Sequence, residues 1–101
     1  MRIVGGKYRH RIICFPDDMA HTRPTKDRIR EAVFSALGDI NGYRVLDLYA
    51  GSGAMGIEAL SRGARHTTFV DISPLAIKTI KGNLDSLKVD NNEYSIIKNK
   101  D

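Results

Sequence analysis

Two acidic residues and a glycine-rich turn are the residues whose types and spacing could do chemistry in this chain. The turn is Gly51-Ser52-Gly53, and Gly56 follows three residues later to complete the pattern G-x-G-x-x-G. Glycines here let the backbone turn tightly and approach a ligand without a Cβ in the way. The pattern lies between a short apolar run, residues 45–49, and an expected helix whose free N–H groups would face the turn. We therefore expect a ligand site where strand, turn and helix meet.

Asp71 and Asp47 indicate which ligand this site suits. Asp71 lies 20 residues after Gly51, at the end of a second expected strand. This is the spacing at which an acid accepts hydrogen bonds from ribose hydroxyls. Asp47 stands four residues before Gly51, where a dinucleotide fold needs an apolar residue, and its charge would repel a pyrophosphate. S-adenosylmethionine, which has a cationic amino-acid end and no phosphate, suits such an acid better. The alternative is that the Asp47 carboxylate only binds backbone N–H groups of the turn.

The length and composition of the chain allow one small domain. Its 101 residues are 42% hydrophobic, which suffices for a single core. No apolar run approaches the roughly 20 residues that span a bilayer, and no signal segment opens the chain. The single cysteine, Cys14, excludes an internal disulfide and a cysteine-rich metal site, and we expect it to be buried as a small hydrophobe. These features predict a cytoplasmic protein without a metal or a membrane span.

Positive charge gathers ahead of the glycine turn. Residues 1–44 hold nine Lys and Arg against five Asp and Glu, whereas residues 45–101 hold seven of each. The whole excess of +4 therefore lies in the first part of the chain. Such a distribution favours a polyanionic partner held through its phosphates. A solvated basic surface without a partner is the alternative.

The first residues are typical of a basic β-hairpin. Gly5-Gly6 joins two β-prone runs, and a tight turn of this kind needs positive φ. Lys7, Arg9 and Arg11 alternate, so on a strand they would share one face and could hold a phosphate backbone. A solvent-facing strand whose charges protect its edge is the alternative. Arg23 precedes an expected helix, where it could meet the charged end of a ligand.

A helix and then alternating strands and helices are expected after this hairpin. Apolar residues at helical spacing before Gly38 predict a buried helix face, formed by Ile29, Ala32, Val33, Ala36 and Leu37. Ser73-Pro74 predicts the start of a later helix, and a third strand is expected over residues 94–97. From residue 45 onward the order strand-helix-strand-helix-strand predicts one half of a doubly wound α/β sheet. We expect its first strand to be buried on both faces.

The sequence resembles the RsmD-like family of bacterial methyltransferases, which modify the exocyclic N2 of a guanine in small-subunit ribosomal RNA. The matching stretches are residues 1–6, 23–25, 27–28, 30–31, 46–53, 56–64 and 83–84. The resemblance implies the S-adenosylmethionine-dependent, Rossmann-like α/β fold of methyltransferases. It implies two parts: a basic N-terminal β-hairpin and loop over residues 1–22, and the N-terminal half of the Rossmann-like domain over residues 23–101, truncated after strand three.

The resemblance also implies site residues. Acids before the glycines, after strand two and after strand three contact the cofactor in such families, which here means Asp47, Asp71 and Asp101. With the turn and the strand ends, the expected cofactor-binding residues are Asp47, Tyr49, Gly51, Ser52, Gly53, Asp71, Ile72 and Asp101. The expected RNA contacts are Lys7, Arg9, Arg11 and Arg23, and the implied partner is ribosomal RNA or the small ribosomal subunit.

One motif of the family has no counterpart in this sequence. The family carries Asp/Asn-Pro-Pro-Tyr/Phe after its fourth strand, where the motif orients the target amine and stacks on the flipped base. The prolines here are Pro16, Pro24 and Pro74, and none fits that motif. We therefore assign no catalytic residue and expect very low methyl transfer by this chain alone. Without a fourth strand, the first strand would also keep an unpaired edge through which copies could associate.

Three other functions remain open from the sequence. A nicotinamide-dinucleotide-binding fragment would share the glycine pattern and Asp71, but Asp47 and the basic hairpin argue against it. An RNA-binding module without cofactor activity explains the charge but not the spacing of Asp71. A methyltransferase that acts on a protein or a small molecule would share the same cofactor site.

Overall fold

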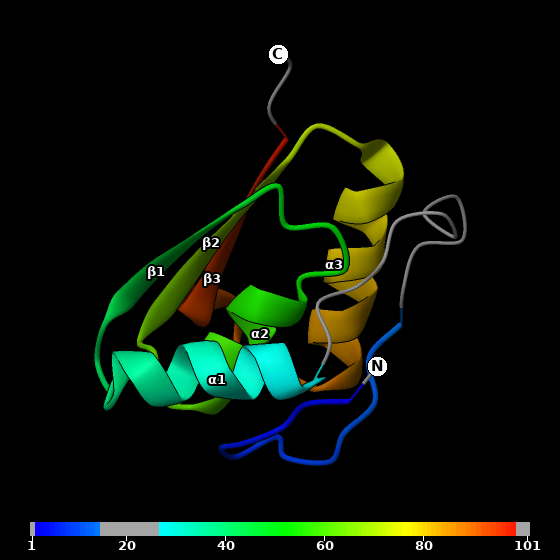
Figure 1. Ribbon diagram of the computed structural model, residues 1–101. Helices are drawn as coiled ribbons and strands as arrows, with labels where there is room; N and C mark the ends of the chain where they lie inside the picture. The colour runs from blue at the N-terminus through cyan, green and yellow to red at the C-terminus, as the bar shows by residue number, and fades with distance from the viewer. Residues whose placement is uncertain (1, 15–26, 99–101) are drawn as a thin grey trace.

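The computed structural model describes residues 2–14 and 27–98, and these residues form a parallel sheet, packing helices and an N-terminal arm (Figure 1). In chain order the elements are α1 (Asp27–Leu37), β1 (Arg44–Leu48), α2 (Ala54–Ser61), β2 (His66–Asp71), α3 (Pro74–Ser86), the 3₁₀ helix η2 (Asn91–Glu93) and β3 (Tyr94–Lys98). The strand order is β1-β2-β3, and both pairings are parallel. The predicted half of a Rossmann-like α/β sheet is therefore confirmed.

The two faces of the sheet differ in exposure. One row across the strands joins Leu48, Val70 and Ile97, and its outer members are 57% and 51% exposed. The neighbouring row contains Phe69, which is fully buried in the same cluster as residues of α2 and α3. The prediction that β1 is buried on both faces is therefore wrong, because both helices pack on the same side of the sheet.

The main core lies between that face of the sheet, α2 and α3. Its fully buried members are Ile57, Leu60, Phe69, Ile80 and Leu84. Gly56 makes the close contact between α2 and β2 possible, since a Cβ at this position would lie 2.3 Å from Phe69 Cε1. The third glycine of the sequence pattern is thus required for helix–sheet packing rather than for the turn itself.

Helix α1 buries a different face from the one that its apolar spacing predicts. Its buried residues are Arg30 and Phe34, whereas Ile29, Val33 and Leu37 are 47%, 37% and 61% exposed. The physical reason is the ion pair between Arg30 and Glu58 of α2, which turns this side of α1 toward α2. The predicted end of the helix is correct: Gly38 has φ of 72° and donates its N–H to the Phe34 carbonyl.

Residues 2–14 form an arm that runs back antiparallel to itself. Arg2 and Ile12 make an antiparallel bridge, and the Ile3 N–H donates to the Arg11 carbonyl. Residues 5–10, between these ends, form bends and turns rather than strands. The predicted antiparallel return is present, but the arrangement of Lys7, Arg9 and Arg11 along one strand face is wrong because no regular strand extends through them.

Candidate cofactor site

Asp47 lies in β1 on the face that α2 covers. Its Oδ2 accepts a hydrogen bond from the Gly56 N–H at 3.0 Å. Burial raises the pKa of Asp47 to about 6; the Gly56 hydrogen bond opposes this rise, and the negative charge of Asp71 adds to it. A positive group placed beside Asp47 would therefore relieve an unfavourable charge, which is a property of ligand sites rather than of ordinary surface acids.

Asp71 is the last residue of β2 and joins the glycine turn to the start of α3. Its Oδ2 accepts from the Gly51 N–H at 2.8 Å, and its Oδ1 accepts from the Ser73 N–H at 2.9 Å. Ser73 in turn caps α3 by accepting from the Ala76 N–H, as the Ser73-Pro74 signal predicts. Each Asp71 oxygen has a further lone pair with which it could accept a hydrogen bond from a ligand hydroxyl.

The turn between β1 and α2 has an unusual backbone. Gly51 and Gly53 have φ of 60° and 83°, and Tyr49 has φ of 55° with its side chain 87% exposed. A non-glycine residue in this conformation costs about 1–3 kcal/mol, and such residues cluster at ligand-binding sites. Ile72, directly after Asp71, is half exposed, whereas the Ser52 side chain is buried. The predicted residues of this edge thus lie together, with Tyr49 and Ile72 open to solvent.

Asn83 is a functional candidate that the sequence analysis did not assign to the site. It is 2% exposed, and its Nδ2 donates to the carbonyls of Ser52 at 2.9 Å and Cys14 at 3.0 Å. Its Oδ1 accepts from the Cys14 N–H at 2.7 Å. One buried amide therefore connects the glycine turn to the N-terminal arm. The prediction that Cys14 is buried is wrong, because only its backbone is held and its side chain is exposed. The signal for Asn83 was its place in the family match.

Glu58 is a second residue that the sequence analysis did not single out, and it anchors the arm to α2. Its carboxylate is fully buried and accepts from the Val4 N–H at 3.0 Å and the Gly5 N–H at 2.9 Å. It also forms ion pairs with Arg30 at 3.5 Å and Arg62 at 2.9 Å. The sequence did hold a signal for Glu58, which lies among the apolar residues Ile57, Ala59 and Leu60. A carboxylate in such a segment is buried only where a partner compensates its charge.

The predicted RNA-contact residues do not share one surface. Lys7 pairs with Glu93 at 3.5 Å, and Arg11 Nη2 donates to the Ser86 carbonyl at 3.0 Å. Arg9 is exposed, and its side chain has no hydrogen-bond or ion-pair partner among the described residues. Arg23 lies outside the described residues, as does the predicted cofactor contact Asp101.

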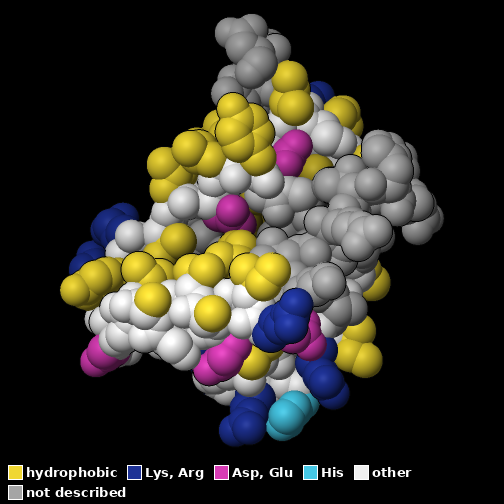
Figure 2. All heavy atoms as spheres, viewed as in Figure 1, with side chains coloured by type: hydrophobic (Ala, Val, Ile, Leu, Met, Phe, Trp, Pro, Cys, Tyr) yellow, Lys and Arg dark blue, Asp and Glu magenta, His cyan; other side chains and the backbone are white. Residues whose placement is uncertain are grey.

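An apolar groove lies beside the edge of β1 with which no other described strand pairs. It has a volume of about 430 Å³, and its walls come from α1, the α1–β1 connection, β1 and the first turn of α2. Figure 2 shows hydrophobic side chains over α1 and β1 on this side of the molecule. Leu37, Tyr43 and Leu46 are each more than half exposed there. Exposed apolar side chains gathered around a groove are typical of an interaction face.

Membrane-spanning helices and metal-binding groups are both absent from the described ranges, 2–14 and 27–98. None of their helices has the length and apolar character needed to cross a membrane. Within the same ranges, no group of three or more His, Cys, Asp or Glu side chains is placed so that it could bind a metal ion.

A parallel strand, a glycine turn and a helix, with one acid inside the first strand and another at the end of the second, belong to the Rossmann-like α/β fold of methyltransferases. A family model described as conserved hypothetical protein 95 matches residues 1–101. The chain therefore belongs to this family, which is the RsmD family, and the resemblance stated from the sequence is confirmed.

Individual relatives agree with this assignment. The ribosomal RNA small subunit methyltransferase D of Escherichia coli strain K12 is 41% identical over 92 residues, covering 90% of this chain and 46% of that protein. The protein of the same name from Haemophilus influenzae is 36% identical over 98 residues, covering 96% and 50%. The solved structure of YhhF from Escherichia coli, a proposed methyltransferase, has a TM-score of 0.85 at 35% identity, covering 99% of this chain and 53% of that one. The chain spans about half the length of these relatives.

Proposed function

We propose that this chain is the cofactor-binding half of an S-adenosylmethionine-dependent methyltransferase that acts on the exocyclic N2 of a guanine in small-subunit ribosomal RNA. The observation that carries the proposal is the pairing of Asp47 and Asp71 beside the glycine turn. Neither carboxylate has an ion-pair partner among the described residues, and the negative charge of Asp71 adds to the burial that raises the pKa of Asp47. The names of the relatives support the RNA substrate. Such a substrate would imply a cytoplasmic protein.

The chemistry of the donor set fits S-adenosylmethionine. Asp47 would hold the positively charged amino-acid end, and Asp71 would accept hydrogen bonds from the ribose hydroxyls. Gly51 and Gly53 leave the turn free of side chains where a ligand approaches, and the exposed Ile72 offers apolar surface beside Asp71. When bound, this cofactor supplies a methyl group activated on a sulfonium. A pyrophosphate would instead be repelled by Asp47, which argues against a nicotinamide dinucleotide.

We also propose that the 101-residue chain transfers methyl groups slowly by itself. Its three prolines do not form the Asp/Asn-Pro-Pro-Tyr/Phe motif that orients the target amine in the family. Methyl transfer depends on placing the amine in line with the sulfonium, so the loss of that positioning should cost several orders of magnitude in rate. A rate close to that of the longer Escherichia coli relative, measured on the same RNA, would contradict this part of the proposal.

Calorimetric titration with S-adenosylhomocysteine tests the cofactor site. Saturable binding is expected for the wild-type chain, and Asp71→Ala should abolish it. Asp85→Ala is the matched control, because Asp85 is an exposed carboxylate of α3 outside the site. Competition by NAD would favour a dinucleotide site. Salt-dependent RNA binding without any S-adenosylhomocysteine binding would favour a simple RNA-binding module.

The free edge of β1 supports a second proposal, that two copies of this chain associate there. No strand within residues 2–14 or 27–98 pairs with this edge, which lies next to the exposed Leu46 and Leu48 and beside the apolar groove. Two identical edges related by a twofold axis can pair as antiparallel strands. Light scattering should show a dimer that Leu46→Lys converts to a monomer. A wild-type chain that is monomeric at high concentration would contradict this proposal.

A further inference from the structure

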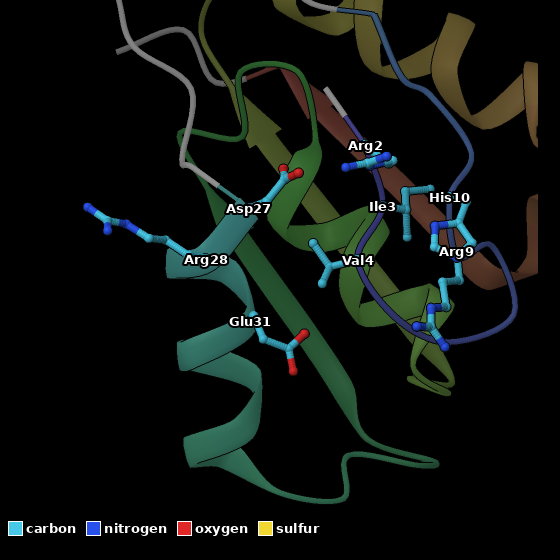
Figure 3. Close-up of a pocket in the computed structure, with 8 residues that line it drawn as sticks. All are labelled: Arg2, Ile3, Val4, Arg9, His10, Asp27, Arg28 and Glu31. Atoms are coloured by element: carbon cyan, nitrogen blue, oxygen red, sulfur yellow. The ribbon is translucent and has the colours of Figure 1, made fainter.

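A cleft between the N-terminal arm and α1 has a volume of about 390 Å³. Its lining residues, drawn in Figure 3, are Arg2, Ile3, Val4, Arg9, His10, Asp27, Arg28 and Glu31. We propose that this cleft binds phosphodiester groups of an RNA backbone, with Arg2 and Arg9 as the principal contacts. The inference rests on the proposed RNA substrate. It relocates the RNA contact from a flat ribbon of Lys7, Arg9 and Arg11 to a two-walled cleft.

The arginines of the cleft are available for a ligand. The side chains of Arg2, Arg9 and Arg28 have no hydrogen-bond or ion-pair partner among the residues that the structure describes. Lys7 and Arg11, by contrast, are engaged with Glu93 and with the Ser86 carbonyl. In Figure 3, Arg2 and Arg9 come from the arm, and Arg28 extends from α1 away from it. Arg28 therefore lies at the outer rim, where it would meet a neighbouring phosphate.

Each acid that lines the cleft already forms an ion pair with an arginine other than Arg2, Arg9 and Arg28. Asp27 pairs with Arg30 at 2.6 Å, and Glu31 pairs with Arg62 at 2.7 Å. The hydrogen bond and charge of Arg62 lower the pKa of Glu31, so this acid stays ionised and paired. With Glu58 included, five arginines face three carboxylates around the cleft, which leaves an excess of two positive charges. An anion can therefore enter without meeting an unpaired carboxylate.

The arm that carries Arg2 and Arg9 is held in place before any ligand binds. The Val4 and Gly5 N–H groups donate to the buried Glu58 carboxylate, and the Lys7 N–H donates to the Ser61 carbonyl at 2.8 Å. At Gly6, with φ of +78°, a Cβ would lie 1.9 Å from that same carbonyl oxygen, so the arm and α2 are in direct contact. An arm whose backbone is already held against α2 loses less conformational entropy on binding than a mobile segment would.

Phosphodiester is the ligand class that these groups suit best. Guanidinium groups bind phosphate oxygens through paired N–H donors, and two arginines several residues apart in the arm could contact successive phosphates. The positive excess of the whole chain lies in residues 1–44, the part that contains both walls of this cleft. The arginines that line the cleft and the positive charge of residues 1–44 therefore both favour a polyanionic ligand.

Fluorescence anisotropy with a short, unstructured RNA oligonucleotide tests the cleft, with the full 101-residue chain titrated at several NaCl concentrations. Arg2→Gln combined with Arg9→Gln should weaken binding about tenfold at low salt. It should also reduce the slope of log K against log salt by roughly 1.4, which is about 0.7 for each lost single-strand phosphate contact. The substitution at Arg2 keeps the backbone carbonyl that accepts from Arg30, so the anchor of the arm remains.

Lys78→Gln combined with Lys81→Gln is the matched control. Both lysines are exposed on α3, far along the chain from the cleft, and the pair removes the same charge. Its binding should stay within about twofold of the wild type. Equal losses in the two double variants would overturn the proposal, since net charge alone would then explain binding. Unchanged affinity in the Arg2 and Arg9 variant would overturn it as well.

Titration with S-adenosylhomocysteine separates the failure of this inference from the failure of the proposed function. A wild-type chain that binds S-adenosylhomocysteine but not the oligonucleotide would overturn the cleft and leave a methyltransferase with another substrate. A chain that binds neither would overturn both. Retained S-adenosylhomocysteine binding by the Arg2 and Arg9 variant would show that any loss of RNA affinity is not a loss of folding.

Discussion

Glu58 and Asp47 are both shielded from water, but the protein stabilises the negative charge of Glu58 and not that of Asp47. Glu58 is fully buried, yet it accepts two backbone N–H groups of the arm and pairs with Arg30 and Arg62. Asp47 accepts one N–H, faces the like charge of Asp71, and has its pKa raised to about 6. The deeper acid is the better satisfied one.

This contrast separates a structural acid from a site acid. The charge of Glu58 is compensated within the protein, so its loss should damage the fold. The charge of Asp47 is left uncompensated among the described residues, so its loss should relieve the fold and damage ligand binding. Burial alone does not distinguish the two; the number of donors and cations around each carboxylate does.

The largest effect is expected for Glu58→Gln. The substitution keeps the shape of the side chain but leaves the buried Arg30 without one of its carboxylate partners. Because glutamine has a single acceptor oxygen, one of the two hydrogen bonds from the arm is also lost. Removing one partner of a buried ion pair costs about 3–5 kcal/mol, so the urea midpoint should fall markedly. Glu93→Gln is the control, because its pair with Lys7 is partly exposed and should contribute little. An unchanged midpoint in Glu58→Gln would refute the structural role of this acid.

Asp47→Asn should have an effect of opposite sign. Because the folded-state pKa of Asp47, about 6, is above its ordinary value of 3.8, the native state binds more protons than the unfolded state between these values. The wild type therefore loses stability as the pH rises from about 4 to about 6. Asparagine retains an oxygen for the Gly56 N–H and carries no charge, so the variant should be more stable by about 2–3 kcal/mol above pH 6 and nearly equal below pH 4. Urea unfolding of both proteins across this range measures the difference, and parallel curves would contradict it.

The affinity for S-adenosylhomocysteine should depend on pH through the same group. Its ammonium favours ionised Asp47, so binding below the pKa of about 6 requires the release of a proton. The dissociation constant should fall by up to tenfold for each unit of pH from about 4.5 to 6 and level off above. Asp47→Asn should bind weakly and without this dependence. A flat wild-type profile would show that Asp47 does not contact the ammonium.

Local signals in the sequence predicted the arrangement of the glycine turn and its two acids well. The strand, glycine turn and helix over residues 44–61, the Ser73-Pro74 helix start, and the places of Asp47 and Asp71 all follow from patterns that span 20 residues or fewer. In a parallel sheet such a segment can form only one arrangement, with the turn at the carboxyl end of β1 and next to the end of β2. The places of Asp47 and Asp71 could therefore be predicted from the sequence, and cofactor binding by these acids stays a prediction.

The arm and α1 could not be predicted in the same way. Apolar periodicity assigns Ile29, Val33 and Leu37 to the core. It cannot predict that Arg30 is buried instead, because that burial depends on an ion pair with Glu58, 28 residues later. The turns over residues 5–10 likewise depend on acceptors supplied by α2, such as Ser61, rather than on the Gly5-Gly6 signal. Structure that depends on partners distant in sequence leaves no local pattern to read.

The smallest effect on stability is expected for Glu31→Gln. Glu31 pairs with Arg62, the arginine that also pairs with Glu58. Arg62 contacts both carboxylates: burial alone would lower its pKa, but hydrogen bonds to Glu58 and Glu31 outweigh burial and raise it. Glu31 lies on the surface, where water solvates its charge whether or not the ion pair forms. The urea midpoint of Glu31→Gln should therefore be indistinguishable from that of the wild type at neutral pH. Any trace of this pair should be lost as the pH falls below the ordinary value of 4.5, opposite in sign to the effect of Asp47, because the pKa of Glu31 is lowered. If Glu31→Gln lowered the midpoint as far as Glu58→Gln does, the number of arginine contacts, and not their burial, would decide which carboxylates hold this fold together.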